Sequence, residues 1–354
     1  MRTNTNRTRR DVLKGATVLG VIGLAGTAGA SEHGNEFEEY NLVVGTSGSG
    51  TPTEAAGLAL ARAADEHSEF LSLTVQNTDG WSANLIEYDG GTIPAMGVDN
   101  NSLSNALEDA GPYEDTPIEN LPHLGFMYTN LDIHFVAMEG TDVTSTADLY
   151  DGGYNIYPLQ PGAGTRALTQ DLLEQAGIWE ANEMLEIEFA DIAGAVEEGR
   201  VDVITMYGVN EVALAGWCEE VDLRSGGALN LIELDDEFQE LIEDHGGAQL
   251  VDLDPYGYEQ DVGEITETMT SWRLIGQWAF GSEVPAEVSY EIAWLSAEHW
   301  ETIQEADPTT IDHSGVESMT EGVIPEIPIH PGVADFWEEH DVWDDEWERG
   351  ELDT

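Results

Sequence analysis

The chain has 354 residues, of which 71 are Asp or Glu and only 11 are Lys or Arg, so its formal net charge at pH 7 is −60. This balance excludes nucleic-acid binding, because almost no positive side chain is left to neutralise phosphate. The hydrophobic content of 41% and the ten Trp residues exclude a disordered acidic tail and indicate a globular core under an acidic surface.

The first thirty residues read as an export signal. They hold five of the eleven positive side chains, namely Arg2, Arg7, Arg9, Arg10 and Lys14. An apolar run over residues 16–25 and the small-residue exit Ala28-Gly29-Ala30 follow, and the run is shorter than the roughly 20 apolar residues of a membrane span. The pair Arg9-Arg10 indicates a twin-arginine signal, which exports folded proteins. The alternative is a basic amphipathic helix of the mature protein.

Removal of residues 1–30 leaves six Arg, no Lys and 70 acids, a formal charge near −64. Self-repulsion of this size requires screening by molar salt, so the composition indicates a halophilic protein. Without Lys there is no P-loop nucleotide site and no Schiff-base chemistry. The single cysteine, Cys218, excludes an internal disulfide and a multi-cysteine metal site, and we expect it to be a buried apolar residue.

In chain order, the pattern is that of an α/β protein. Residues 31–39 are polar and predict a flexible tether. Strands are predicted at residues 40–45, 71–77, 92–98, 121–139, 154–160, 201–209 and 264–280, and helices at 53–66, 81–90, 99–111, 145–150, 162–177, 191–198, 235–245, 285–306 and 333–343. We expect mostly parallel strands.

Two glycine-rich turns each join a strand to a helix. They are Gly45-Thr46-Ser47-Gly48-Ser49-Gly50-Thr51 and Pro161-Gly162-Ala163-Gly164-Thr165-Arg166. The N-terminus of a helix attracts anions through its unpaired N–H groups and its dipole, and Arg166 adds a forked donor for a carboxylate. Two such turns facing one cleft would bind a small carboxylate. The alternatives are that the glycines only permit tight turns and that Arg166 makes a surface ion pair.

Five segments together resemble the TAXI-type solute receptors of TRAP transporters. They are "VVGTSGSGTPTEAAGLALARA", "NTDGWSANLIEYDGGTIPAMGVDN", "STADLYDGGYNIYPLQPGAGTRALTQDLLEQAG", "EEGRVDVITMYGVNEVAL" and "IPIHPGVADFWEE", in family order over nearly the whole mature chain. The family's first loop usually continues Gly-Gly-x-Tyr-Tyr, whereas this chain has Gly50-Thr51-Pro52-Thr53-Glu54 and lacks that aromatic contact. Val203 after Asp202 also departs from the family's Asp-Ala pattern.

The resemblance implies a two-lobe periplasmic-binding-protein-like α/β fold with a hinge and an interdomain cleft. Lobe 1 would comprise residues 40–135 and 270–354, and lobe 2 residues 136–269. It also implies a monomeric receptor outside the cell, without a cofactor or metal, that passes a small organic anion such as glutamate or a dicarboxylate to the permease subunits of a TRAP transporter. By position, the ligand-binding residues would be Thr46, Ser47, Ser49, Thr51, Asp79, Gly80, Trp81, Ser82, Gly162, Gly164, Thr165, Arg166, Tyr207 and Asn210.

Two other classes of function stay open from the sequence. A secreted hydrolase would use a pair of Asp or Glu side chains facing each other in a cleft, and a surface or adhesion module would have a filled, rigid cleft. The segment His330-Pro331-Gly332 predicts a structural turn, because no partner motif for a catalytic histidine accompanies it. The acidic pairs lack the spacing of a calcium loop.

Overall fold

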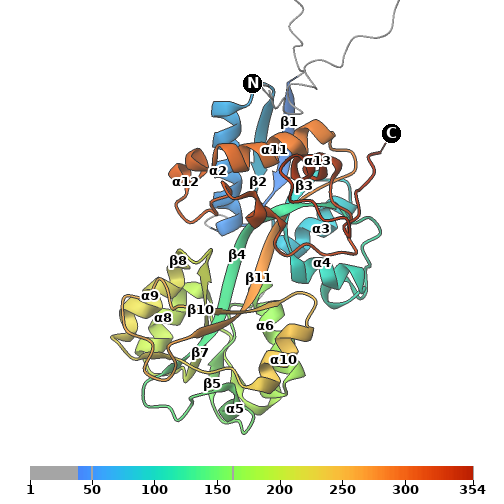
Figure 1. The fold of residues 1–354 in the computed structure, drawn as a ribbon. Coiled ribbons are helices and arrows are strands. Elements are labelled where there is room, and N and C mark those ends of the chain that lie inside the picture. The colour runs from blue at the N-terminus through green and yellow to red at the C-terminus, as the bar shows by residue number, and fades with distance from the viewer. Residues whose placement is uncertain (1–38, 49–50, 162, 354) are drawn as a thin grey trace, which may run out of the picture.

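The chain folds into two lobes (Figure 1). Apolar side chains gather into two separate cores, one in each lobe. The computed structural model describes residues 39–48, 51–161 and 163–353. The predicted export signal and all of the predicted tether except Glu39 lie outside these residues. Cys218 is fully buried in the core of lobe 2, as expected. The two-lobed α/β fold that the sequence predicts is confirmed.

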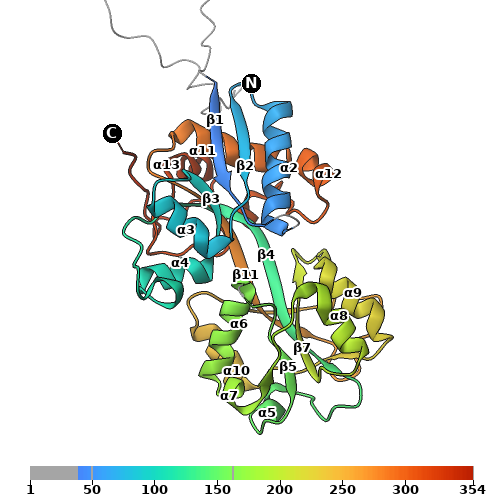
Figure 2. The ribbon, with the colours of Figure 1, turned by 180° about the vertical axis from the view of Figure 1, so that it is seen from behind.

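Lobe 1 contains three parallel strands with helices around them (Figures 1 and 2). The central strand β1 pairs with β2 on one side and β3 on the other. Side-chain caps fix where two of the helices begin, since Thr51 accepts from the N–H of Glu54 and Asp99 accepts from that of Ser102. The elements are β1 (Tyr40–Gly45), α2 (Pro52–His67), β2 (Leu71–Gln76), α3 (Trp81–Asp89), β3 (Ala95–Asp99), α4 (Asn100–Leu107), η1 (Gly111–Tyr113), α11 (Ala286–Glu298), α12 (Trp300–Ala306), η2 (Val316–Thr320) and α13 (Pro331–Glu339).

Lobe 2 repeats the pattern with β5 between two parallel neighbours, β6 and β7. Ser145 forms a capping box at the start of α5, and Asp235 caps α10. The elements are α5 (Thr146–Leu149), β5 (Asn155–Tyr157), α6 (Gly164–Gln175), α7 (Ile178–Ala181), β6 (Glu183–Met184), α8 (Phe189–Glu197), β7 (Val203–Val209), β8 (Ala213–Leu214), α9 (Gly216–Ser225), β9 (Leu229–Leu231), α10 (Asp236–Asp244) and β10 (Gln249–Leu253).

Two long strands join the lobes: β4 (His123–Met138) and β11 (Met269–Phe280) run antiparallel to each other through both (Figure 1). The sheet order is β2-β1-β3-β11-β4-β7-β5-β6, with β10, β8 and β9 attached at its sides. The expectation of mostly parallel strands is therefore wrong, and the sheet is mixed. Antiparallel pairing enters wherever β4 or β11 contacts a neighbour, because the two crossing strands traverse the molecule in opposite directions.

Along each of these two strands, the buried side chains pass from the core of one lobe to the core of the other. In β4 the change falls between Tyr128 and Leu131, and in β11 between Leu274 and Trp278. The divisions expected at 135/136 and 269/270 both lie within the same strands. The pairing of β11 with β4 shifts register on both sides of Gln277, and such irregularities bend and twist a strand locally. The hinge therefore lies where the ladder is irregular.

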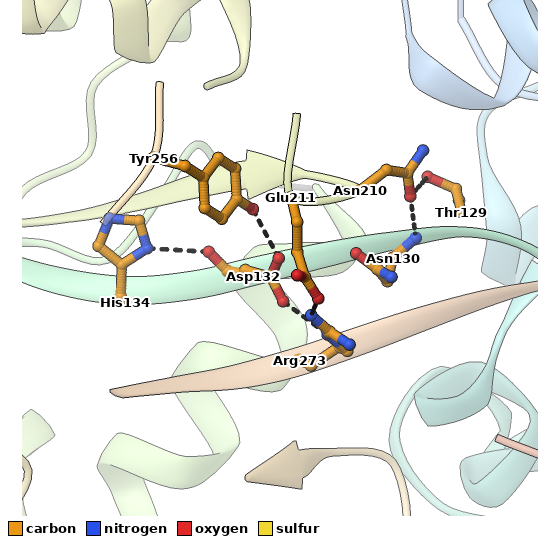
Figure 3. A network of polar contacts seen from close by, with 8 residues as sticks. All are labelled: Thr129, Asn130, Asp132, His134, Asn210, Glu211, Tyr256 and Arg273. Atoms are coloured by element: carbon orange, nitrogen blue, oxygen red, sulfur yellow. Dashed lines mark hydrogen bonds and ion pairs between the residues drawn. The ribbon is translucent and has the colours of Figure 1, made fainter. Parts of the chain in front are cut away.

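A buried polar network holds the two hinge strands together just inside lobe 2 (Figure 3). Arg273 of β11 and Asp132 of β4 are direct cross-strand partners, and the Arg273 Nε donates to Asp132 Oδ1 at 2.6 Å. The hydroxyl of Tyr256 donates to the other carboxylate oxygen at 2.5 Å, and the Arg273 Nη2 donates to Glu211 at 2.5 Å. Burial raises the pKa of Asp132, and Arg273 acts in the opposite direction. The carboxylate thus depends on its partners to stay charged.

We predict that Arg273→Gln lowers the free energy of unfolding by about 3–5 kcal/mol, because it leaves Asp132 charged, buried and without its cation. Chemical denaturation in constant molar salt measures this. The matched control is Arg224→Gln, since Arg224 makes its ion pairs at the surface, where pairs contribute little. Equal losses in the two variants would contradict the structural role of the buried pair.

The helix predicted over residues 285–306 is two helices. It breaks at His299, which leaves the helical conformation with φ −124° and ψ 28° and ends α11. The His299 ring stacks on that of His67 at 3.8 Å and contacts Trp294 edge-on. An amphipathic pattern continues through both helices, so the sequence alone gave no signal for the break.

The segment His330-Pro331-Gly332 is the tightly packed start of α13, as predicted for a structural turn. His330 is fully buried; its Nε2 donates to the carbonyl of Val284 at 3.1 Å and its Nδ1 accepts from Ser289 Oγ at 2.6 Å. Gly332 lies directly against α11, where an added Cβ would overlap the carbonyl of Ala286. Only glycine allows α13 to approach α11 this closely.

Gly332→Ala should therefore destabilise the protein by about 1–3 kcal/mol, the usual cost of overpacking. Gly216→Ala is the control, because a Cβ at Gly216 meets no atom within 4 Å and a helical alanine reduces the entropy of the unfolded chain. Thermal unfolding of both variants checks this. A Gly332 variant as stable as the wild type would show that α13 can move away from α11 without loss.

Candidate functional site

A cavity of about 680 Å³ lies between the two lobes. It lies where the carboxyl ends of parallel strands from each lobe meet the helices that follow them, the usual place for a ligand in an open α/β sheet. A volume of this size is typical of small-molecule sites. The described residues that line it are Ser47, Gly48, Thr51, Pro52, Thr53, Asp79, Gly80, Trp81, Ser82, Ala83, Pro112, Leu131, Gln160, Pro161, Ala163, Gly164, Thr165, Arg166, Ala167, Gln170, Phe189 and Tyr207.

The lobe 1 wall consists of the loops that follow β1 and β2 and the first turns of α2 and α3. Asn84 braces this wall from beneath: its Nδ2 donates to the carbonyls of Thr46 and Gly97 at 2.7 and 2.8 Å. Gly80 precedes α3 with φ +113°, a conformation that favours glycine. These contacts hold small polar side chains, such as Ser47 and Ser82, at the surface of the cavity.

Trp81 is the largest side chain of the lobe 1 wall and reaches across to lobe 2. Its Nε1 lies 2.9 Å from both Thr53 Oγ1 and the Tyr128 hydroxyl, so its ring is fixed within lobe 1. A Cβ built on Gly164 of α6 would lie 3.4 Å from the Trp81 ring, which is ordinary van der Waals contact. Trp81 thus lies beside the start of α6 and packs with the core of lobe 2.

The lobe 2 wall is formed by the start of α6, the start of α8 and the end of β7. Helix α6 begins at Gly164, so the positive end of its dipole lies at the cavity. Phe189 begins α8, and its N–H donates to Gln160 Oε1 at 2.9 Å. Tyr207 lies near the end of β7, beside the ring of Trp217 at 5.7 Å. The wall therefore combines anion-attracting backbone with two aromatic rings.

Arg166 is buried at the start of α6, with its side chain 6% exposed. Arg166 does form an ion pair, with Glu186, but its guanidinium is buried and does not lie at the surface. Its Nη1 donates to the carbonyl of Leu159 at 2.7 Å and its Nη2 to Glu186 at 2.8 Å, while the guanidinium lies 4.8 Å above the ring of Trp179. Its Nε is buried and bonds no protein atom, and neither does the Oγ1 of Thr165. Two residues that line the cavity thus each hold a buried polar atom without a protein partner.

The charge of the cavity differs from that of the rest of the chain. Among the described lining residues, only Asp79 and Arg166 are charged, although one residue in five of the chain is acidic. Burial of a charged group is unfavourable unless it is paired, and the only charged partner of Arg166 among the described residues is Glu186, whose side chain is 61% exposed. The site can therefore accept a further negative group beside Arg166.

The structure brings ten of the fourteen predicted site residues to this cavity: Ser47, Thr51, Asp79, Gly80, Trp81, Ser82, Gly164, Thr165, Arg166 and Tyr207. Ser49 and Gly162 lie outside the described residues. Thr46 is fully buried beneath the wall, where its Oγ1 donates to the carbonyl of Gln76. Asn210 lies at the hinge instead, where it accepts from the N–H of Asn130 at 2.7 Å (Figure 3). It also donates to the carbonyl of Thr309 in lobe 1 at 2.6 Å.

Several lining residues were not predicted from the sequence, among them Thr53, Gln160, Gln170 and Phe189. Thr53 and Gln160 are within three residues of predicted positions, so extending the two glycine turns would have found them. Phe189 had a weaker signal, an aromatic residue just before the predicted helix at 191–198. Its position opposite lobe 1 depends on the packing of α8, which no local pattern reveals.

A second cavity of about 570 Å³ lies between α4 of lobe 1 and residues 246–249 of lobe 2. Arg273 is the one cation among the described residues that line it, and it already forms ion pairs with Asp132 and Glu211 at the hinge. Glu108 and Glu326 also line it. An anion would therefore meet two carboxylates and a neutralised guanidinium, so the cavity at α6 is the better candidate site.

The cleft lacks the machinery of the hydrolase alternative among its described residues. Asp79 is the one carboxylate that lines it, whereas glycoside hydrolysis needs a facing pair. No group of three or more His, Cys, Asp or Glu side chains is placed to hold a metal within the described ranges. The open volume also differs from the filled cleft expected of an adhesion module. In the same part of the chain, no helix is long and apolar enough to cross a membrane.

No protein-family model matches the sequence, and no curated protein is similar to it in sequence. Solved structures similar in fold include the periplasmic aliphatic sulphonate binding protein SsuA from Escherichia coli, at 13% identity over 85% of this chain and 79% of that one, with a TM-score of 0.38. The alkanesulfonate-binding protein SsuA from Xanthomonas axonopodis pv. citri, bound to MOPS, is 14% identical over 88% and 96%, with a TM-score of 0.40. A TctC solute binding protein from Polaromonas is 12% identical over 78% and 92%, with a TM-score of 0.45. At these scores, the ligands named for the neighbours say nothing about the ligand of this chain.

Three buried histidines lie outside the cavity lining and stay neutral near pH 7. Burial lowers the pKa of His134, His313 and His330 to about 4 each. His134 lies in the hinge network, where its two ring nitrogens lie 2.9 Å from the carbonyl of Asp132 and 2.5 Å from the Tyr258 hydroxyl. These imidazoles serve packing and hydrogen bonding, and none is placed at the candidate site.

We predict that the free energy of unfolding falls as the pH is lowered from about 6.5 to 5. In this window the unfolded chain binds protons at the three histidines and the folded protein does not, at about 1.4 kcal/mol per pH unit for each histidine. Urea unfolding at fixed molar salt, which keeps the surface charges screened, measures the slope. His313→Gln should reduce the slope, and a flat profile in the wild type would contradict the neutral state of these rings.

Proposed function

We propose that this protein is a solute-binding receptor that takes up a small organic molecule bearing a carboxylate between its two lobes. The observation that carries the proposal is a cavity lined by both lobes at which a buried guanidinium and a neighbouring hydroxyl, those of Arg166 and Thr165, have donors without a protein partner. A carboxylate beside the start of α6 would satisfy both and would interact favourably with the helix dipole.

The hinge gives the receptor a way to close on its ligand. The lobes are joined by β4 and β11 with an irregular ladder between them, and closure of two lobes about such strands encloses a ligand and removes it from water. Trp81 of lobe 1 lies beside Gly164 and packs with the core of lobe 2, so the two walls approach each other at this point.

The finer part of the proposal concerns the partner. With the twin-arginine signal and the TAXI-like segments of the sequence, we infer that the receptor works outside the cell, as a monomer, and delivers its ligand to the membrane permease subunits of a TRAP transporter. Glutamate and dicarboxylates are the first ligands to consider on that resemblance. The acidic surface suits molar salt, where screening keeps it from repelling an anionic ligand at distances above about 3 Å.

The function is tested by calorimetry in molar salt against a broad panel of carboxylates, together with mass spectrometry of small molecules that co-purify with the protein. A saturable ligand with one site per chain supports the receptor. The absence of any ligand in both experiments would overturn it. Turnover of an ester or glycoside would favour the hydrolase in its place.

Arg166→Gln should weaken binding of the identified carboxylate by about 2–4 kcal/mol, or roughly 30- to 1,000-fold, because it removes a charged donor from a buried site. Thr165→Val removes only the hydroxyl donor and should cost less while keeping the shape of the side chain. Arg200→Gln is the control, since Arg200 lies at the surface. Wild-type affinity in folded Arg166→Gln would exclude the guanidinium from the site.

A further inference from the structure

The charges of the cavity limit how many carboxylates a ligand can carry. Arg166 is the only cation among its described lining residues, and Glu186 already shares that guanidinium at 2.8 Å. A second ligand carboxylate would find no other cation there and would be repelled by Asp79 if it lay on the lobe 1 side. Desolvating an unpaired charge is strongly unfavourable. The cavity is therefore suited to one carboxylate.

The position of that carboxylate follows from the unsatisfied donors. Thr165 and Arg166 are each only 5% exposed, and their free Oγ1 and Nε belong to adjacent residues in the first turn of α6. A carboxylate here also faces the positive end of a twelve-residue helix. The Trp81 ring packs against Gly164, one residue earlier. The body of the ligand must therefore extend from α6 past the Trp81 ring.

Three aromatic rings border that path, and small polar side chains such as Ser47 and Ser82 also line the cavity. Trp81 comes from lobe 1, and Phe189 and Tyr207 come from lobe 2. Trp217 supports the two lobe 2 rings from behind: it stacks on Phe189 at 4.7 Å with the planes 19° apart, and it meets Tyr207 edge-on at 5.7 Å. The N–H of Phe189 is held by Gln160. Rings fixed in this way form a rigid surface for a flat apolar group.

We propose that the ligand is a monocarboxylate with a planar, apolar body, such as an aryl-substituted acid, and is not a dicarboxylate. This inference rests on the proposed receptor function and narrows it, because the TAXI resemblance by itself points to glutamate or dicarboxylates. Arg166 and Thr165 bind the carboxylate, and Trp81, Phe189 and Tyr207 select the body.

Calorimetry in molar salt with the purified full chain tests the class. The probes are phenylacetate, hexanoate, succinate, glutamate and the uncharged phenylacetamide. We expect phenylacetate to bind at least tenfold more tightly than succinate or glutamate, because it places one charge beside Arg166 and an aromatic ring beside the three rings that border the path. Phenylacetamide should bind at least tenfold more weakly than phenylacetate, because it lacks the carboxylate.

Two variants separate the carboxylate contact from the aromatic contact. Arg166→Gln should weaken the binding of phenylacetate and the binding of hexanoate by the same factor. Phe189→Leu should reduce the preference for phenylacetate over hexanoate at least fivefold, since leucine keeps the apolar volume and removes the ring. Phe70→Leu, at a partly buried phenylalanine that packs in lobe 1 away from the cavity, is the matched control and should leave the preference unchanged.

The outcomes distinguish this inference from the receptor function. Tighter binding of succinate or glutamate than of phenylacetate would overturn the ligand class and leave the receptor intact. An unchanged preference in Phe189→Leu would overturn the role of the aromatic wall. Binding of none of the probes, with no ligand found in the broader carboxylate panel, would overturn the receptor function and this inference with it.

Discussion

The contact on which the molecule depends is the antiparallel pairing of β4 with β11, the two strands that belong to both lobes. Their ladder is the continuous covalent and hydrogen-bonded connection between two independent cores. The buried pair of Asp132 and Arg273 fixes its register just inside lobe 2, because a slip by one residue would leave both charges unpaired in the interior. Tyr256 and Glu211 complete the pair from the surrounding loops.

The cavity is a consequence of this arrangement. Each lobe has its own parallel strands, and the hinge strands turn the carboxyl ends of both sets toward the same space. Helices that start there present their N-termini, and loops that end there present small polar side chains. Neither lobe alone encloses the cavity, so binding and closure are linked by geometry. A ligand that contacts both walls stabilises the closed arrangement by its differential affinity for it.

The surface and the cavity of this protein carry different charges. The surface is densely acidic, which requires salt, while the cavity is nearly free of acids and keeps one buried guanidinium. Of the six arginines in the described part of the chain, Arg166 and Arg273 are the two that are buried, and they lie at the cavity and at the hinge. Arginine suits both places because its fork binds carboxylates bidentately and stays charged when buried.

Local patterns were sufficient to predict the α/β class, nearly all the strand-to-helix junctions and several described residues of the two glycine turns that line the cavity, because turn chemistry, capping and apolar periodicity act over a few residues. Tertiary structure alone decided the rest. The mixed sheet follows from β4 and β11 crossing in opposite directions. The break at His299 places its ring in a stack on that of His67, a contact between residues far apart in the chain. Asn210 lies at the hinge, where it forms hydrogen bonds with Asn130 and Thr309. Phe189 lines the cavity because of the way α8 packs. These contacts join residues far apart in the chain, and a contact of that kind leaves no period or motif in the sequence.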